Sequence, residues 1–314
     1  MEKLDICNEE ESFAREIFMK LGIENNIDSC LIGKGYTGTI WKISDNFCLK
    51  VSTKNDLTDI PESFKSCENL CVPLKSVVSQ SGKYIGHILK YLNMCSLEFL
   101  IKNNIKLTEE QARIILYDIL KGVNVIHENG YVHRDFHPGN IMLTKDNKKI
   151  NAVIIDFDDM QPMKEETKVC FRYNGYQAPE IVFDDDTYDG KSEMFTLGII
   201  FWELILGKCP FGGYDFFGKI IEESWDKYTE NSQYYNDRVK EALKTAPQYL
   251  KRRNEISDEC FDLLRSLLDF NKNNRMTANE LLNHPFLTKD AKKSFKNKIE
   301  NNIYNKEVSD MERE

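Results

Sequence analysis

Residues 133–140 read His-Arg-Asp-Phe-His-Pro-Gly-Asn, and this stretch decides the fold and the chemistry of the chain. It follows a segment with apolar residues at helical spacing and precedes a short strand-like run, Ile-Met-Leu at 141–143. Asp135 can accept a proton from an attacking hydroxyl, and Asn140 can offer its side-chain oxygen to Mg²⁺. An acid and an amide at this spacing predict a catalytic loop.

A second acidic group follows one strand later. Residues 152–155, Ala-Val-Ile-Ile, read as a buried strand that delivers Asp-Phe-Asp at 156–158. A carboxylate at the end of such a strand, Asp156, suits a Mg²⁺ ion that bridges the β and γ phosphates of a nucleotide. Any one of these acids could be a loop cap or a surface charge, but their ordered spacing favours a metal and phosphate site.

A glycine-rich stretch lies near the N-terminus, where residues 32–40 read Ile-Gly-Lys-Gly-Tyr-Thr-Gly-Thr-Ile. Gly33, Gly35 and Gly38 let the backbone approach phosphate oxygens and present N–H groups to them. A plain hairpin is the simpler interpretation, and a dinucleotide-binding Rossmann unit is another. The Rossmann fingerprint opens a helix, whereas residues 39–43 read as a strand, so the pattern favours a lid over ATP.

Lys50 lies in the apolar run 47–51, one hairpin after the glycines. It could be a solvated lysine on an edge strand. Its position also suits a cation that reaches the α and β phosphates, and we expect this second role.

The remaining pattern divides the chain into a β-rich part and a helical part. Short β-type runs over 28–92 predict a small antiparallel sheet. A capping box at 108–111, Thr-Glu-Glu-Gln, opens a long amphipathic helix. Further helices are predicted at 191–207, 216–229, 258–269 and 277–283. The expected fold class is α+β.

Composition excludes several classes of function. The net charge of −9 argues against general affinity for nucleic acid, whose phosphates need a basic surface. No run of about 18 apolar residues is present, and the N-terminus lacks the features of a signal peptide. The nine cysteines form no CxxC pair and no zinc-ligand spacing. We expect an intracellular, cytoplasmic protein with reduced thiols, no membrane span and no nucleic-acid partner.

From about residue 28 to 288 these motifs, in this order, resemble the eukaryotic protein-kinase family. Residues 178–180, Ala-Pro-Glu, match a family motif, and residues 274–286 resemble the family's C-terminal signature. Residues 193–211 look like the central hydrophobic helix of the larger lobe and the segment after it. The resemblance implies a partly buried ion pair between Glu180 and Arg275.

The resemblance also implies a two-lobed enzyme that uses ATP and Mg²⁺ to phosphorylate a protein hydroxyl, with serine or threonine as the family default. The implied divisions are an extension at 1–27, an N-lobe at 28–92, a C-lobe at 93–288 and a charged tail at 289–314. Lys50, Arg134, Asp135 and His137 would serve catalysis, and Asn140 and Asp156 would bind the metal. The nucleotide would lie against the lid, the gatekeeper Leu89, the hinge and apolar walls, at Ile32, Gly33, Lys34, Gly35, Gly38, Ile40, Cys48, Lys50, Leu89, Lys90, Tyr91, Leu92 and Leu143.

Two departures from the family leave the acceptor open. Asp158 stands where the family usually has glycine, and His137 stands where serine/threonine kinases usually have lysine. Near pH 7 a largely neutral imidazole gives less charge stabilisation than an ammonium. The pairing of His-Pro-Gly-Asn with Ile-Asp-Phe-Asp is reminiscent of aminoglycoside and choline kinases. A small-molecule kinase and a nucleotide-binding pseudokinase or scaffold therefore stand as alternatives, while Arg134 and the C-lobe motifs favour a protein kinase.

Other positions also bear on specificity and activation. The acidic partner of Lys50 should lie on a helix between the third and fourth strands, where Glu62 and Glu68 are both candidates. Thr167 could be a phosphosite held by Arg134 or simply an exposed threonine, and the simpler interpretation is favoured. Tyr173 stands where serine/threonine kinases tend to have threonine. Glu193 stands where the family's helix begins with aspartate.

Overall fold

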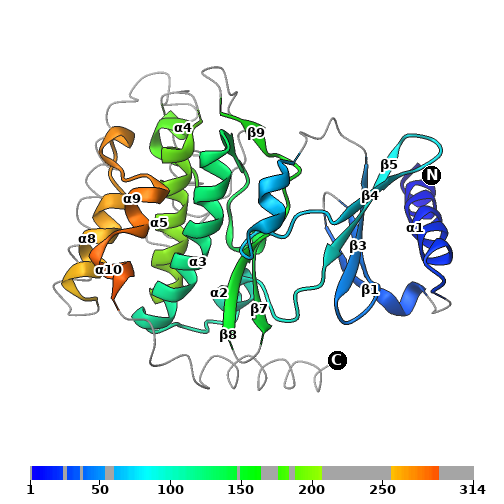
Figure 1. Ribbon diagram of the computed structural model, residues 1–314, viewed down its shortest axis with the longest axis horizontal. Coiled ribbons are helices and arrows are strands. Elements are labelled where there is room, and N and C mark those ends of the chain that lie inside the picture. Colours follow the sequence, from blue (N-terminus) through cyan, green and yellow to red (C-terminus); the bar gives the residue numbers. More distant parts are fainter. Residues whose placement is uncertain are drawn as a thin grey trace.

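A computed structural model describes residues 2–23, 27–35, 38–53, 60–146, 149–163, 176–183, 188–206 and 256–289. It contains a β-rich part and a mainly helical part, which lie at opposite ends of the view in Figure 1. The predicted α+β, two-lobed architecture is confirmed. No helix among the described residues combines the length and the apolar character needed to cross a membrane.

The β-rich part is a five-stranded antiparallel sheet with the order β1-β2-β3-β5-β4. Its strands are β1 (Leu31–Lys34), β2 (Thr39–Lys42), β3 (Phe47–Thr53), β4 (Lys75–Val78) and β5 (Tyr84–Lys90). In the register of β3 with β5, Lys50 lies opposite His87 and Cys48 lies opposite Leu89. Residues directly opposite each other share a face of the sheet, so these four side chains gather on one side.

The other face of the sheet is covered by helix α1 (Glu2–Lys20). Its buried residues form one cluster with apolar side chains of β2, β3 and β5: Phe13, Ala14, Ile17, Phe18, Trp41, Leu49, Val51 and Tyr84. Gly86 permits this close approach, because a Cβ there would lie 2.6 Å from Cδ1 of Ile17. The expected extension thus contains a helix that packs on the sheet. The 3₁₀ turn η1 (Ile27–Cys30) leads from it into β1.

The segment between β3 and β4 comprises residues 54–74, of which 60–74 are described. These residues form the 3₁₀ helix η2 (Glu62–Ser66), a turn at 68–69 and a single β-bridge from Leu70 to Ile154. Phe64 on η2 is fully buried and belongs to the core cluster of the helical part. This segment therefore ties the sheet to the second part of the molecule.

The second part is built around α3 (Glu109–Glu128) and α5 (Gly190–Leu206). The predicted capping box forms, since Thr108 accepts from Gln111 N while Gln111 accepts from Thr108 N. The other described elements are α2 (Leu97–Lys102), β6 (Tyr131–Val132), η3 (Pro138–Asn140), β7 (Ile141–Asp146), β8 (Lys149–Ile154), β9 (Gln161–Pro162), α4 (Pro179–Phe183), α8 (Asp258–Leu267), η4 (Lys272–Asn274), α9 (Ala278–Leu282) and α10 (Pro285–Thr288).

The predicted helices at 191–207, 258–269 and 277–283 match α5, α8 and α9 to within two residues at each end. The helix predicted at 216–229 lies outside the described residues, as do residues 207–211 and the tail beyond 289.

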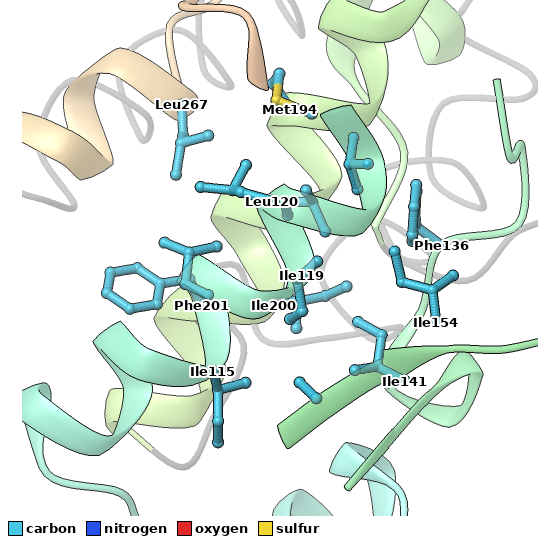
Figure 2. Packing of buried hydrophobic residues seen from close by; sticks show 14 of the residues in the cluster. Ile115, Ile119, Leu120, Phe136, Ile141, Ile154, Met194, Ile200, Phe201 and Leu267 are labelled. Atoms are coloured by element: carbon cyan, nitrogen blue, oxygen red, sulfur yellow. The ribbon is translucent and has the colours of Figure 1, made fainter. Parts of the chain in front are cut away.

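The main hydrophobic core lies where α3 packs against α5 and the β7–β8 hairpin. Figure 2 shows Ile115, Ile119 and Leu120 of α3 facing Ile200 and Phe201 of α5. Phe136, Ile141 and Ile154 complete this core on the hairpin side. Because Phe136 and Ile141 flank residues 137–140, the core holds both ends of that loop in place.

Candidate active site

His133 anchors the start of the loop at 133–140. It is fully buried, and its Nε2 lies 3.0 Å from the carbonyl oxygen of Ile155 while its Nδ1 accepts from Asp135 N at 3.3 Å. The ring stacks on Phe136 with 4.5 Å between the centroids. The histidine thus connects the loop at 133–140 with the segment that carries Asp156.

Glu193 fixes the next residue of the loop. Arg134 has a φ of 70°, a left-handed conformation that costs energy for any residue with a Cβ. Its N–H donates to Oε1 of Glu193 at 2.7 Å, and Oε2 of the same carboxylate lies 2.7 Å from Nε2 of His127. Glu193 is fully buried in the first turn of α5. The residue that departs from the family's aspartate therefore holds the loop directly.

Asp135 and Asn140 lie side by side. The side-chain N–H₂ of Asn140 donates to Oδ2 and to the backbone oxygen of Asp135, both at 2.9 Å. The amide nitrogen is thereby committed to Asp135, so the side-chain oxygen is the end that can meet a ligand. The backbone oxygen of Asn140 accepts from Ile155 N at 3.0 Å, which brings Asn140 beside the segment that carries Asp156.

Lys50 meets two carboxylates from the Asp-Phe-Asp segment. Its Nζ lies 2.8 Å from Oδ1 of Asp156 and 2.7 Å from Oδ2 of Asp158, and the lysine side chain is 9% exposed. Burial alone would lower the pKa of Lys50, but the two carboxylates outweigh burial and raise that pKa. The lysine is therefore a buried cation shared by two acids.

The two acids differ in their titration. Burial raises the pKa of both, but Lys50 more than offsets this at Asp156, whose pKa is lowered. At Asp158 the pKa is raised, because burial and the charge of Asp156 together outweigh Lys50. Asp156 also has a φ of 63°, and Phe157 between the two acids is buried against Phe64 and His133. The segment is thus held by packing as well as by charge.

His137 is a neutral neighbour of Asp135. Burial lowers its pKa, and the Asp135 and Glu98 carboxylates offset only part of that effect. Its Nδ1 accepts from Gly139 N at 3.1 Å, and its Nε2 lies 3.8 Å from Oδ2 of Asp135. A neutral ring that accepts at Nδ1 carries its proton on Nε2, so it presents an N–H towards Asp135.

Some of the residues expected to bind adenine pack together near β5 and β7. Leu92, Cys71 and Val153 form a small buried cluster, against which Leu89, Met142 and Ile155 pack. The thiols of Cys48 and Cys71 both point to the backbone oxygen of Lys90, at 3.9 and 3.6 Å. Lys90 itself is exposed, and Tyr91 donates its N–H to the backbone oxygen of Asn46 at 2.8 Å.

Leu143, also expected beside adenine, lies apart from this cluster. It is fully buried in the core of the helical part, whereas the preceding residue, Met142, packs with the small cluster. Side chains alternate along a strand, so the two residues of β7 face opposite sides. Met142 is therefore the residue of β7 that lies beside Leu89 and Leu92.

The glycine stretch is described at residues 31–35 and from 38 onward. Gly35 N donates to Gly38 O at 2.8 Å. Gly38 has a φ of 156°, and a Cβ there would lie 2.2 Å from the backbone oxygen of Val51. This glycine is required by the close approach of β3. Ile32 and Lys34 on β1 are exposed, and Ile40 on β2 is half-buried.

Neither candidate acid between β3 and β4 contacts Lys50. Glu62 pairs with Lys65 at 2.7 Å, and Glu68 pairs with Lys121 at 3.0 Å. Both glutamates are largely exposed. The second carboxylate at Lys50 is Asp158, which the sequence singled out only as a missing glycine.

The implied ion pair between Glu180 and Arg275 is present. Two guanidinium nitrogens of Arg275 donate to the two carboxylate oxygens at 2.8 and 2.7 Å, and both residues are buried. Ser192 also donates to Glu180, at 2.8 Å. Thr167 and Tyr173 lie outside the described residues.

Comparison with known proteins gives one family. Residues 32–287 match the family model described as "Protein kinase domain". Mitogen-activated protein kinase 5 of Oryza sativa subsp. indica is 30% identical over 204 residues, which cover 61% of this chain and 54% of the relative. Serine/threonine-protein kinase ATG1a of Arabidopsis thaliana is 27% identical over 252 residues, covering 78% and 35%. The chain thus spans about half the length of the mitogen-activated relative and less of ATG1a.

Among solved structures, the crystal structure of the Rad53 kinase domain and SCD2 in complex with AMPPNP has the same fold. Its TM-score is 0.55 at 21% identity, and the match covers 84% of this chain and 92% of that chain.

Proposed function

This chain belongs to the protein kinase domain family, and on that premise we propose that it transfers the γ-phosphate of ATP to the hydroxyl of a protein serine or threonine. The observation that carries the proposal is the contact between Asp135 and Asn140. This pair lies beside the segment that carries Asp156, and Asp156 in turn pairs with Lys50 of β3. A proton acceptor, oxygen ligands for a metal and a buried cation lie together, which is the set that phosphoryl transfer needs.

ATP would bind beneath the β1–β2 turn. Gly33, Gly35 and Gly38 would let the backbone approach the phosphates, with Ile32, Lys34 and Ile40 beside them, and Lys50 would pair with the α and β phosphates. The bound AMPPNP named for the Rad53 structure supports nucleotide binding in this fold.

The adenine ring would lie against Leu89, Cys48, Leu92 and Met142, close to the backbone of Lys90 and Tyr91. The backbone oxygen of Lys90 receives two weak thiol donors, from Cys48 and Cys71. An adenine amino group is a stronger donor and would replace them. This supports residues 90–92 as the hinge.

Asn140 and Asp156 fit a magnesium ion. Both offer side-chain oxygens, the ligands that Mg²⁺ prefers, and the hydrogen bond from Ile155 N to Asn140 O joins their segments. When bound, the ion would neutralise charge on the phosphates. Asp135 would orient the acceptor hydroxyl and take its proton, and Arg134 would face a charged group of the activation segment.

The family membership favours a protein acceptor, and two relatives carry kinase names of the serine/threonine and mitogen-activated kind. His137 and Asp158 favour a second candidate, a small-molecule kinase. A nucleotide-binding scaffold without turnover is a third. All three bind nucleotide, so they are separated by whether phosphate is transferred and, where it is, by the acceptor.

We would incubate the protein with Mg²⁺ and [γ-³²P]ATP, and offer casein, histone, an aminoglycoside or choline. Transfer to protein serine or threonine supports the proposal, and ATP consumption only with the small molecules supports the second candidate. Nucleotide binding without any transfer supports the scaffold.

Asp135→Asn is the control for this experiment. Losing the positioned base should lower turnover by roughly 10²–10⁴-fold while nucleotide binding persists. Phosphorylation near the wild-type rate by this variant would contradict the assignment of Asp135 as the base.

A further inference from the structure

The partner of Lys50 is unusual for this fold. In protein kinases the lysine of the third strand is held by a glutamate from a helix between the third and fourth strands. We propose that Asp158 does this here: its carboxylate positions Lys50 for the phosphates, so the acid comes from the segment after the metal ligand. The inference rests on the proposed function and names a positioning residue within the same site.

The described part of the usual segment offers no carboxylate at this place. Residues 60–74 carry Glu62 and Glu68, and each is largely exposed and paired with a surface lysine. In this described part, Phe64 packs near Phe157 with 6.3 Å between the ring centroids. Residues 60–74 thus supply an apolar contact but no acid at Lys50.

Asp158 makes the closer of the two contacts at Lys50. Its Oδ2 lies 2.7 Å from Nζ, and its side chain is 16% exposed. Buried charged groups of this kind depend on their partners, because neither can be solvated instead. If Lys50 turned away from Asp158, the largely buried carboxylate of Asp158 would lose this ion pair.

The backbone holds Asp158 in position. Met160 N donates to Phe157 O at 3.1 Å, so residues 157–160 form a turn with Asp158 as its second residue. Phe157 on one side and Met160 on the other are buried. A glycine at position 158 would bring no side chain to Lys50, whereas aspartate places a carboxylate oxygen 2.7 Å from Lys50 Nζ.

The two acids beside Lys50 would have different roles. If Asp156 turns its oxygens to a metal, as proposed, it gives up part of its bond to Lys50. Asp158 then remains as the carboxylate that keeps Lys50 in place. Because only Phe157 separates Asp156 from Asp158, the lysine and the metal ligand are aligned by the same short segment, without the placement of a separate helix.

The test is a double-mutant cycle between Lys50 and Asp158. The affinity for AMPPNP with Mg²⁺ would be measured by calorimetry for wild type, Asp158→Asn, Lys50→Met and the double variant. If Asp158 acts through Lys50, Asp158→Asn weakens binding about 10-fold or more in wild type, as expected for a charge-assisted hydrogen bond, and less than about 2-fold in the Lys50→Met background. An equal loss in both backgrounds, or no loss in wild type, overturns the proposal.

Two further variants sharpen the result. Asp158→Glu keeps the charge and should recover part of the lost affinity. Glu68→Gln removes one negative charge from the segment where the partner usually lies, and it should bind like wild type. A loss at Glu68→Gln as large as that at Asp158→Asn would place the partner back on that segment.

The proposal stands or falls separately from the proposed function. If the wild-type protein binds AMPPNP but transfers no phosphate, the proposed activity is contradicted, and the double-mutant cycle can still be measured. If the wild type binds no nucleotide, the same four proteins are unfolded in urea without it. Non-additive changes in the unfolding equilibrium constant then support the contact, and additive changes overturn it.

Discussion

His87 on β5 lies directly opposite Lys50 on the neighbouring strand β3, and its surroundings keep it neutral. Its Nδ1 lies 2.7 Å from Oγ of Ser76, and the side chain is buried. Burial lowers the pKa of His87, and Lys50 lowers it further, while Asp158 and Asp156 offset only part of this. A neutral imidazole beside the buried lysine avoids placing two cations together.

The lowered pKa of His87 makes stability depend on pH. In the unfolded state the histidine takes up a proton at about pH 6.5, which is a higher pH than in the folded state. The stability that neutral His87 contributes is therefore fully present above that pH and is lost as the pH falls. In His87→Gln, the unfolding free energy should decline less steeply than in wild type as the pH falls from 7.5 to 5.5. The slopes of the two proteins should differ by at most about 1.4 kcal/mol per pH unit. Urea titrations at each pH measure this, and identical slopes for the two proteins would contradict it. His137, whose pKa is also lowered, keeps part of the decline in the variant.

The buried guanidinium of Arg275 is surrounded by hydrogen-bond acceptors. It is 1% exposed and donates to Glu180 as well as to the backbone oxygens of Asp269, Phe270 and Lys191. Its ring neighbour Phe195 lies 4.9 Å from the guanidinium carbon. The arginine therefore connects α4, α5 and the turn before α9.

Glu180→Ala should lower the unfolding free energy by about 3–5 kcal/mol, because it leaves the buried guanidinium of Arg275 without its carboxylate. Urea unfolding followed by circular dichroism measures the change. The matched control is Glu62→Ala, which breaks an exposed pair with Lys65 and should cost less than about 1 kcal/mol. Equal costs in the two variants would argue against the importance of burial.

At the scale of elements, the ends of helices follow local signals. The start of α3 has a capping box, and the same device opens α9 with Thr277 and Glu280. Each satisfies backbone N–H groups that have no partner within the helix. Because α3 packs on α5, α9 and β8, its first turn sets the position of a central element.

Thr108→Ala should cost about 1 kcal/mol of stability, since the N–H of Gln111 loses its acceptor. Thr108→Ser keeps the hydroxyl and should stay close to wild type. Chemical denaturation of both variants decides the matter. A loss in the serine variant as large as in the alanine variant would show that the methyl group, and not the cap, matters.

At the scale of the whole molecule, the sequence predicts the parts that depend on local patterns. The antiparallel sheet and the capped start of α3 follow from residue type and order. The buried pair of Glu180 and Arg275 is implied by the resemblance to a known family, and not by a local pattern. The partner of Lys50 follows from neither, because Asp158 lies 108 residues away in sequence and only the folded chain brings it there. Strand alternation would have favoured Met142 over Leu143 without any structure.

Helix α1 is an intermediate case. Its apolar residues at 13, 14, 17 and 18 have helical spacing, so the helix was accessible from the sequence. Its docking site was not, because this depends on the missing side chain of Gly86 opposite Ile17. Long-range packing of this kind is a property of the assembled sheet.

Phe64 joins the two parts of the molecule at the site itself. It comes from the segment between β3 and β4, is fully buried in the core of the helical part, and packs near Tyr131 and Phe157. Phe157 lies between the two acids that hold Lys50. A change at Phe64 should therefore affect both the stability of the protein and the alignment of the proposed nucleotide site.

Phe64→Ala should lower the unfolding free energy by about 3–5 kcal/mol through the cavity it leaves, and it should also weaken binding of AMPPNP with Mg²⁺. Phe286→Ala is the matched control, because Phe286 is equally buried but packs on Phe201 within the helical core. That control should lose similar stability and keep its nucleotide affinity. Urea unfolding and calorimetry on the same samples separate the two effects. If both variants lose affinity alike, nucleotide binding follows overall stability, and the contact of Phe64 with Phe157 has no special part in aligning the site.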